Sequence, residues 1–282
     1  MPEIHPSAVV DKTAHLGSGV TVGPLAVVEA GVVIGDGCSL AAHVVVKSGT
    51  ILGQNNVVCE YSVLGGRPQY LAAGAEVGTL VIGDNNTIRE QVTIHRGLTP
   101  EQRTTVGSHN MLMVSSHIGH ACHIDTHIIM ANNLMLGGHV MAQDHIYFGG
   151  AAAVHQFCRV GKYAMVGGQA RVTQDVPPYV MIDGATTRVV GLNRIGLKRK
   201  GFTDDQLLML KQAYRIIYRC GLSWKEVLET LDATFASPLI TEWRQFLTHG
   251  ERGFVRERHA ERGSAIKLFT QGDGDDNISK AG

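Results

Sequence analysis

The amino-acid sequence carries an aliphatic residue at every sixth position over most of residues 4–172. Ile, Leu, Val or Met fills 24 of the 26 positions in phase, a regularity that a chain with 44% apolar residues does not produce by chance. An α-helix repeats every 3.6 residues and a half-buried strand every 2, so neither explains a period of six. The period predicts a parallel β-helix, in which short strands and turns coil around a narrow core. The positions in phase are Ile4, Val10, Leu16, Val22, Val28, Ile34, Leu40, Val46, Leu52, Val58, Leu64, Ile82, Ile88, Ile94, Val106, Leu112, Ile118, Ile124, Met130, Leu136, Ala142, Phe148, Val154, Val160, Val166 and Val172.

A second class of small side chains follows four positions after the aliphatic residues, and we expect it to point into the same core. Three six-residue units complete one coil of a triangular prism, so residues 18 positions apart stack in successive coils. Cys122 and Cys158 belong to this class, and we interpret them as core packing rather than as nucleophiles. Other members are Ala8, Ala14, Ala26, Cys38, Ser62, Ser116, Ala152 and Ala164.

Two interruptions keep the six-residue phase but lose its pattern. They cover residues near 66–79 and 97–105, and we predict that both are loops that leave the prism. Loops longer than about 12 residues in a compact domain are usually functional or disordered. The repeat ends before Pro177 and Pro178, which cannot donate ladder hydrogen bonds. The sequence thus predicts a mainly β fold in which residues 1–190 form the β-helix.

The residues after the repeat carry helix signals instead. Capping boxes begin at Thr203 and Ser223, where a hydroxyl residue precedes Gln or Glu by three positions. Ser237 precedes a proline, which suits the first turn of a third helix. We therefore predict a small C-terminal α-helical domain over residues 191–256. Residues 257–282 are predicted to form a polar, partly disordered tail.

Composition excludes several classes of protein. The 25 basic and 25 acidic side chains cancel, whereas a dedicated nucleic-acid binder carries a marked basic excess. No run approaches the roughly 18 consecutive apolar residues of a membrane span, and the first residues do not follow the basic-then-apolar pattern of a secretory leader. We therefore expect a cytoplasmic protein without stable membrane insertion and without nucleic acid as a partner.

Histidines concentrate in one part of the repeat, since nine of the 14 lie within residues 95–155. The histidines of the edge described below do not fall at the inward aliphatic or small positions, so they face solvent or a neighbouring chain. The 18-residue stacking gathers four polar side chains and a glycine on one edge of the prism: His120, Gly138, His139, His155 and Gln156.

This edge suits proton transfer. Imidazole has a reference pKa of about 6.5, so a neutral histidine accepts a proton at pH 7. A backbone N–H at Gly138 or beside it would stabilise the oxyanion formed during acyl transfer. The G-x-S-x-G motif of serine hydrolases does not occur, so direct transfer with histidine as base fits better than a covalent acyl-enzyme. A metal site is the rival hypothesis, but no two histidines are five residues apart, the spacing of the zinc enzymes built on a similar prism. The pair His123 and His127, four residues apart, has a spacing that serves a helix, so we expect no metal.

Several motifs resemble those of the UDP-N-acetylglucosamine acyltransferases, the hexapeptide-repeat family that opens lipid A biosynthesis. They include Ile118–Cys122 (IGHAC), Ala153–Cys158 (AVHQFC), Gln174–Val180 (QDVPPYV) and Gly196–Phe202 (GLKRKGF). The resemblance implies a left-handed β-helix and a homotrimer with sites between adjacent prisms. It also implies transfer of an (R)-3-hydroxyacyl chain from the phosphopantetheine of acyl carrier protein to the 3-hydroxyl of a UDP-sugar, with no further cofactor.

The resemblance assigns roles to individual residues. By match, His120 is the general base, the Gly138 amide stabilises the oxyanion, and Gly168 lies where the family sets acyl length. Glycine there leaves the groove open, so a longer chain is expected to fit. Asn193 and Arg199 are expected to face the nucleotide sugar. The remaining substrate contacts are expected at Gln69, His95, His117, His139, His155 and Gln156.

Five positions depart from the family pattern. Ala121 replaces the aspartate that usually follows the catalytic histidine, so His120 lacks an adjacent carboxylate. The other departures lie on the nucleotide-sugar side: Tyr70, Ala72, Thr186 and Ile195. Three alternatives therefore stay open. They are N-acylation of a 3-amino UDP-sugar, a different sugar nucleotide or acyl-coenzyme A as substrate, and a non-catalytic β-helix scaffold.

Overall fold

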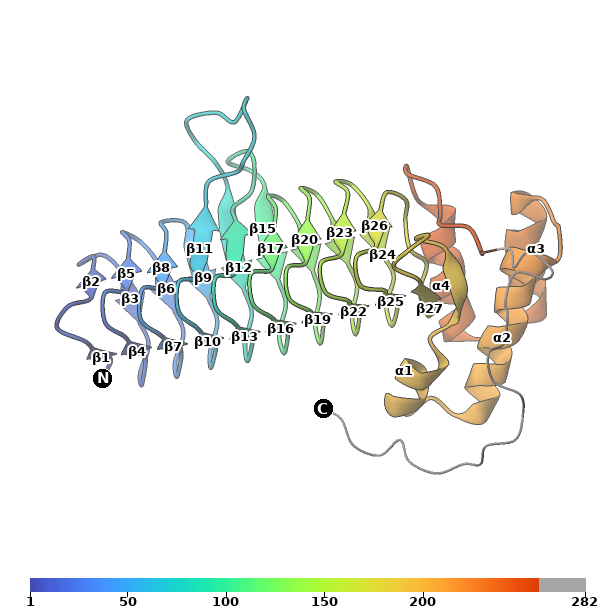
Figure 1. Ribbon diagram of the computed structural model, residues 1–282, viewed down its shortest axis with the longest axis horizontal. Coiled ribbons are helices and arrows are strands. Elements are labelled where there is room, and N and C mark those ends of the chain that lie inside the picture. Colours follow the sequence, from blue (N-terminus) through green and yellow to red (C-terminus); the bar gives the residue numbers. More distant parts are fainter. Residues whose placement is uncertain (259–282) are drawn as a thin grey trace.

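The computed structural model describes residues 1–258 as a long three-sided β-helix with a group of helices at its C-terminal end (Figure 1). Successive strands turn from the first sheet to the second and then to the third, so each coil contributes one short strand to each side. Neighbouring strands within a side are parallel, apart from the antiparallel pair β27–β28 that ends the first sheet. The predicted left-handed parallel β-helix with C-terminal helices is confirmed.

The three sheets are built as follows. The first contains β1 (Glu3–Ile4), β4 (Thr21–Val22), β7 (Ser39–Leu40), β10 (Val57–Val58), β13 (Thr87–Ile88), β16 (Met111–Leu112), β19 (Ile129–Met130), β22 (Tyr147–Phe148), β25 (Met165–Val166), β27 (Val180–Ile182) and β28 (Val189–Leu192). The second contains β2 (Val9–Val10), β5 (Val27–Val28), β8 (Val45–Val46), β11 (Val63–Gly66), β14 (Thr93–His95), β17 (His117–Ile118), β20 (Met135–Leu136), β23 (Ala153–Val154) and β26 (Arg171–Val172). The third contains β3 (His15–Leu16), β6 (Val33–Ile34), β9 (Thr50–Leu52), β12 (Thr79–Ile82), β15 (Arg103–Val106), β18 (His123–Ile124), β21 (Met141–Ala142) and β24 (Arg159–Val160).

We number the corners of the prism by the sheets they join. The first corner joins the first sheet to the second, the second corner joins the second to the third, and the third corner returns the chain to the first sheet. Turn residues at these corners often have left-handed backbone conformations, for example Asn133 (φ 61°), His139 (φ 60°) and His127 (φ 57°). The turns therefore recur at fixed intervals, and the side chains that they carry form rows along the prism.

The repeat positions form the core as predicted. The in-phase residues from Val22 to Val172 are buried, and so are Cys122 and Cys158. Burying each aliphatic side chain contributes about 1.5–3 kcal/mol before chain entropy is subtracted. Ile4 departs from the prediction and is 46% exposed, because a neighbouring coil covers it on one side alone.

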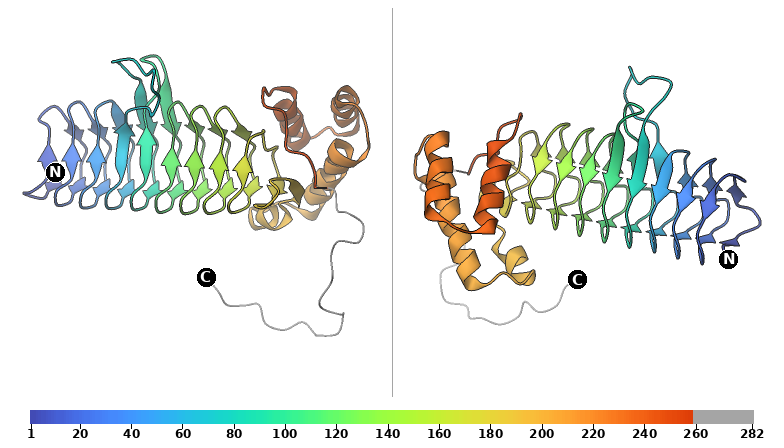
Figure 2. Two further views of the ribbon diagram at one scale, coloured as in Figure 1. Left: turned by 45° about the horizontal axis from the view of Figure 1, so that its top comes forward. Right: turned by 180° about the vertical axis from the view of Figure 1, so that it is seen from behind.

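Both predicted loops leave the prism at the second corner and project together on the same side of the molecule (Figures 1 and 2). Residues 67–78 connect β11 to β12, and residues 96–102 connect β14 to β15. Arg67 holds the first loop through hydrogen bonds to the carbonyls of Gly74 (2.7 Å) and Ala75 (2.9 Å). The second loop is shorter than predicted, since Arg103–Val106 already pairs with β12 in a parallel ladder.

Four helices follow the prism in the described part of the chain: α1 (Arg194–Arg199), α2 (Asp204–Arg219), α3 (Trp224–Thr234) and α4 (Pro238–Thr248). Both predicted capping boxes are present, at Thr203 and Ser223, while Ser237 precedes α4 without a side-chain cap. Helix α1 was not predicted from the sequence; its first turn is capped by Asn193. No helix among the described residues is long and apolar enough to cross a membrane. The predicted tail falls outside the described residues from position 259 onward.

Buried asparagines reinforce three consecutive coils. The Asn86 side chain donates to Asn56 Oδ1 (2.9 Å) and to the Gly107 carbonyl (2.9 Å), and it accepts from the Asn110 amide (2.9 Å). All three asparagine side chains lie in the core. Each of these polar groups is thereby satisfied without water, which a buried amide requires.

Asn86→Ala should lower the free energy of unfolding by about 2–3 kcal/mol, because it removes the hydrogen-bond partner of the buried Asn110 amide and of the Gly107 carbonyl. Urea unfolding followed by circular dichroism at a fixed protein concentration measures the change. Asn85→Gly is the matched control, since Asn85 is exposed and left-handed (φ 57°), a conformation that glycine adopts freely. Equal stability of the two variants would contradict a role for the ladder.

Candidate active site

A cleft of about 670 Å³ lies along the outer face of the second sheet and continues onto the second corner. Its floor comes from the strands β17, β20, β23 and β26, and the first loop overhangs it with Gln69 and Tyr70. The lining contains four of the predicted histidines together with apolar and small residues. Its members include His95, His117, Gly119, His120, Met135, Gly137, Gly138, Ala153, His155, Gln156, Arg171 and Thr173.

The imidazole of His120 lies directly against the backbone of Gly138 in the next coil. A Cβ atom on residue 138 would come 2.5 Å from His120 Cε1 and 2.6 Å from Nε2, far inside van der Waals contact. Glycine at position 138 is therefore a steric requirement of the ring's placement. The predicted column of His120 above Gly138 is present, and it brings an imidazole to a backbone amide.

Rings pack around His120 on two sides. His139 meets it edge to face, with ring centroids 5.0 Å apart, and His139 itself stacks on Phe157 at 4.6 Å. Tyr70 approaches from the loop, with its ring centroid 6.3 Å from that of His120. Burial and the neighbouring His139 lower the pKa of His120 below its usual value. The ring is therefore neutral at pH 7 and able to accept a proton.

Nδ1 of His120 is buried and has no hydrogen-bond partner among the described residues. Ala121 stands where the resembling sequences carry an aspartate. Accordingly, no carboxylate of a described residue forms a hydrogen bond with His120 Nδ1. Ala121 is itself buried, with a left-handed backbone (φ 56°).

Two further histidines form the opposite part of the cleft. His95 and His117 meet edge to face at 4.9 Å, and His117 Nδ1 shares a 2.8 Å hydrogen bond with Thr93 Oγ1. Burial, followed by the proximity of His117 and His120, lowers the pKa of His95 to about 4. Burial also lowers the pKa of His117. These rings are neutral at pH 7 and present hydrogen-bonding groups rather than charges.

Gly138 lines the cleft, and its amide is unpaired among the described residues. No described residue accepts a hydrogen bond from it, whereas the adjacent Gly137 and His139 amides bond to Val154 and His120 carbonyls. An unpaired N–H beside a neutral imidazole is the arrangement that acyl transfer uses to hold a developing oxyanion.

The structure brings most of the predicted substrate residues together. Gln69, His95, His117, His155 and Gln156 line the cleft with the predicted base. His139 does not line it but supports the ring of His120. Gly168 lies outside the lining, at the first corner, where a Cβ atom would come 3.3 Å from the Gly150 carbonyl oxygen.

Asn193 and Arg199 lie at a different edge of the prism. The Asn193 side chain caps α1 by accepting from the Gly196 amide (3.1 Å) and donates to the Tyr163 carbonyl (2.9 Å) at the third corner. Arg199 is exposed in the last turn of α1. Within one chain, neither residue belongs to the cleft.

Two residues of the cleft lining were not predicted from the sequence, although the 18-residue stacking of coils identifies them. Met135 and Arg171 project from the outer face of the second sheet in the same row as His117, because each strand there pairs in register with the next. Extending the 18-residue spacing from His117 would have found both. The other described histidines do not line the cleft. Three of them, His109, His127 and His145, stack along the third corner, with the ring centroids of the last two 4.7 Å apart.

A second cleft, of about 480 Å³, separates the third sheet from α4. Charged side chains line it, and Lys162 pairs with Glu242 across it. It contains none of the residues predicted to act on a substrate.

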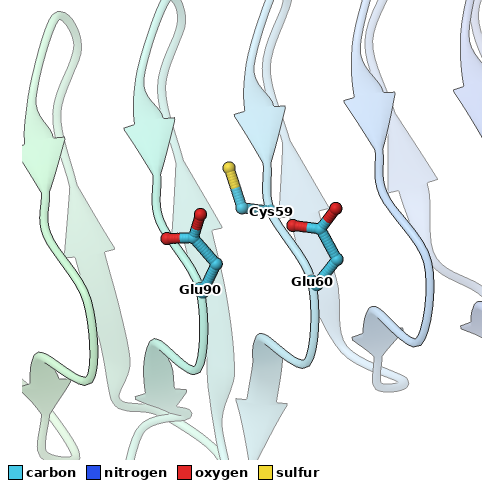
Figure 3. A group of neighbouring side chains, drawn as sticks. All are labelled: Cys59, Glu60 and Glu90. Carbon is cyan, nitrogen blue, oxygen red and sulfur yellow. The ribbon is translucent and has the colours of Figure 1, made fainter.

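One group of side chains has the composition of a metal site. Ligand atoms of Cys59, Glu60 and Glu90 lie within 4.8 Å of one another on the first corner (Figure 3). However, Arg89 holds the Glu90 carboxylate through hydrogen bonds of 2.8 and 3.0 Å. Burial and Glu90 raise the pKa of Cys59, which disfavours the thiolate that metals bind. The group lies outside the histidine cleft.

Two protein-family models match separate parts of the chain. Residues 13–48 match the model of the bacterial transferase hexapeptide, and residues 175–255 match the second domain of UDP-N-acetylglucosamine O-acyltransferase.

Curated relatives cover most of the chain. An acyl-[acyl-carrier-protein]–UDP-N-acetylglucosamine O-acyltransferase of Janthinobacterium sp. (strain Marseille) is 45% identical over 262 residues, which is 91% of this chain and 100% of that protein. A protein of the same name from Anaeromyxobacter sp. (strain K) is 45% identical over 255 residues, covering 90% of this chain and 99% of its own length.

Solved structures agree with the sequence matches. The UDP-N-acetylglucosamine acyltransferase of Francisella novicida superposes with a TM-score of 0.88 at 34% identity, covering 94% of this chain and 100% of that one. The Arabidopsis enzyme of the same name superposes with a TM-score of 0.81 at 36% identity, covering 90% of this chain and 100% of that one. The chain therefore belongs to the UDP-N-acetylglucosamine O-acyltransferase family.

Proposed function

We propose that this protein transfers an (R)-3-hydroxyacyl chain from acyl carrier protein to the 3-hydroxyl of UDP-N-acetylglucosamine, the reaction that opens lipid A biosynthesis. The observation that carries the proposal is the neutral imidazole of His120 beside the unpaired Gly138 amide in a cleft lined by histidines. The names of relatives that match over nearly their whole length support the choice of substrates.

In the proposed mechanism, the His120 imidazole removes the proton from the sugar 3-hydroxyl as its oxygen attacks the thioester carbonyl. The carbonyl oxygen becomes an oxyanion, which accepts a hydrogen bond from the Gly138 amide. Collapse of the tetrahedral intermediate breaks the carbon–sulfur bond. The imidazolium then returns its proton to the departing phosphopantetheine thiolate. Neither a covalent acyl-enzyme nor a resident cofactor takes part.

The proposed active unit is a homotrimer with each cleft shared between two copies. The placement of Asn193 and Arg199 supports this, because they lie at the third corner while the cleft lies at the second. A neighbouring prism that packs its third corner against the cleft would supply both residues to the nucleotide. The basic run Lys198–Lys200, exposed at the same corner, would attract phosphate or the acidic carrier protein. We propose that the reaction takes place in the cytoplasm, because both proposed substrates, a UDP-sugar and acyl carrier protein, are soluble.

Turnover tests the proposal directly. Purified protein incubated with 3-hydroxyacyl carrier protein and UDP-N-acetylglucosamine should form the O-acylated sugar nucleotide, detected by mass spectrometry. His120→Ala should lower kcat by about 10²–10⁴-fold, the contribution typical of a general base, while the melting temperature changes by a few degrees or less. A large loss of thermal stability in this variant would mean that the residue is structural.

The acid limb of the pH–rate profile should lie below pH 6.5. Burial and His139 lower the pKa of His120, so the base stays unprotonated to a lower pH than a free histidine. The titratable groups that face its ring are His139, His95 and Tyr70. Measurement of kcat/KM between pH 5 and 8 checks this, because that ratio reports ionisations of the free enzyme. A limb above pH 6.5 would contradict the assignment.

Hybrid trimers should recover activity from two inactive parents. If His120 and Arg199 of one site come from adjacent copies, a 1:1 hybrid of His120→Ala and Arg199→Ala subunits leaves about one site in four with both residues intact. Co-refolded mixtures should therefore show about a quarter of wild-type activity. The control is a mixture of the two parents refolded separately, which should stay inactive. Activity no higher than in that control would place both residues' functions within one copy.

A second candidate function is N-acylation of a 3-amino UDP-sugar. The observation that favours it is the unpartnered Nδ1 of His120, with Ala121 in the aspartate position. A neutral amine is a stronger nucleophile than a hydroxyl and depends less on a well-oriented base. Competition between the hydroxyl and amino acceptors in one assay distinguishes the two functions, because the preferred substrate has the higher kcat/KM.

A further inference from the structure

The turn that carries His120 is held differently from the next turns along the same corner. The amide of His139 donates to the His120 carbonyl in the preceding coil (2.9 Å), and the amide of Phe157 donates to the Gly138 carbonyl (3.1 Å). By the same spacing Ala121 would donate to the carbonyl of Gln102. That carbonyl belongs to the second loop and instead accepts from the Thr79 amide (3.2 Å).

A side chain replaces the missing backbone acceptor. The Ala121 amide donates to Thr104 Oγ1 at 2.8 Å, and both residues are buried. Thr104 lies on β15 in the inward row that also contains Thr50 and Leu80, so its hydroxyl approaches the turn from inside the prism.

The peptide unit between His120 and Ala121 is therefore fixed from both neighbouring coils. Its N–H is bound by Thr104 from the preceding coil, and its C=O is bound by the His139 amide from the following coil. This clamp sets the backbone from which the His120 side chain projects onto Gly138. The ring needs such support, since its buried Nδ1 has no partner to orient it.

We propose that Thr104 is a positioning residue for the reaction, holding the His120–Ala121 peptide so that the imidazole lies against Gly138. The inference rests on the general-base role proposed for His120. Thr104 does not line the cleft, so its hydroxyl acts through the turn and not on the substrate. Without this acceptor the buried Ala121 amide must seek water, and the turn moves with it.

Thr104→Val removes the acceptor while keeping the shape of the side chain. We expect kcat to fall about 10-fold to 100-fold, the order of loss that a small misplacement of a reacting group produces, with KM for both substrates within about 3-fold of wild type. Thr104→Ser keeps the hydroxyl and should restore at least half of the wild-type kcat.

Thr50→Val is the matched control. Thr50 occupies the same inward row and is equally buried, but its hydroxyl has no hydrogen-bond partner within residues 1–258 and lies outside the cleft lining. This variant should keep the wild-type kcat. Equal losses in Thr50→Val and Thr104→Val, no loss in Thr104→Val, or no recovery in Thr104→Ser would each overturn the proposal.

A spectroscopic titration separates failure of this inference from failure of the proposed function. NMR of the His120 ring protons measures its pKa without any substrate. In Thr104→Val the turn should open to water, so the pKa should rise toward the value of a free histidine, while Thr50→Val should match wild type. An unchanged titration in Thr104→Val contradicts the positioning role, even for a protein that fails to turn over the proposed substrates.

Discussion

Stacking of successive coils through parallel backbone hydrogen bonds is the constraint on which the rest of the structure depends. Each strand pairs in register with the strand one coil away, as His117 does with Met135, and aliphatic side chains fill the space between the three sheets. Because the register repeats, each residue type recurs at a fixed place around the prism. The site is built by this translation, which puts His120 over Gly138 and His139 beside both.

The two loops interrupt the regular stacking of coils at the second corner. Both leave at the second corner, where the first loop overhangs the cleft with Gln69 and Tyr70 and the second loop interrupts the backbone ladder beneath His120. Because of this interruption the Ala121 amide has no backbone carbonyl as its acceptor, and it donates instead to the buried Thr104 hydroxyl. The turn that carries His120 thus differs from the next turns along the corner because the second loop lies directly before it in the stack of coils.

Much of this arrangement could be predicted from the sequence, because a period of six admits few folds. The buried rows, the His120–Gly138 column and both capping boxes follow from spacing alone. The short helix α1 escaped prediction because its six residues include a glycine.

Features outside the repeat could not be predicted in the same way. The loop has no period, so spacing gave no position for Tyr70. The Thr104 hydrogen bond depends on where the loop rejoins the prism, which a repeat does not specify. Residues at another corner, such as Asn193 and Arg199, would join the proposed shared site only through a neighbouring copy, and the repeat of a single chain does not specify that contact.

The proposed function depends most on where the acceptor sugar binds. A crystal structure of the protein with UDP-N-acetylglucosamine tests this directly. The sugar is expected to occupy the cleft at the second corner, with its 3-hydroxyl oxygen about 3 Å from the His120 imidazole. A sugar bound in the charged cleft beside α4, or one whose 3-hydroxyl points away from His120, would contradict it.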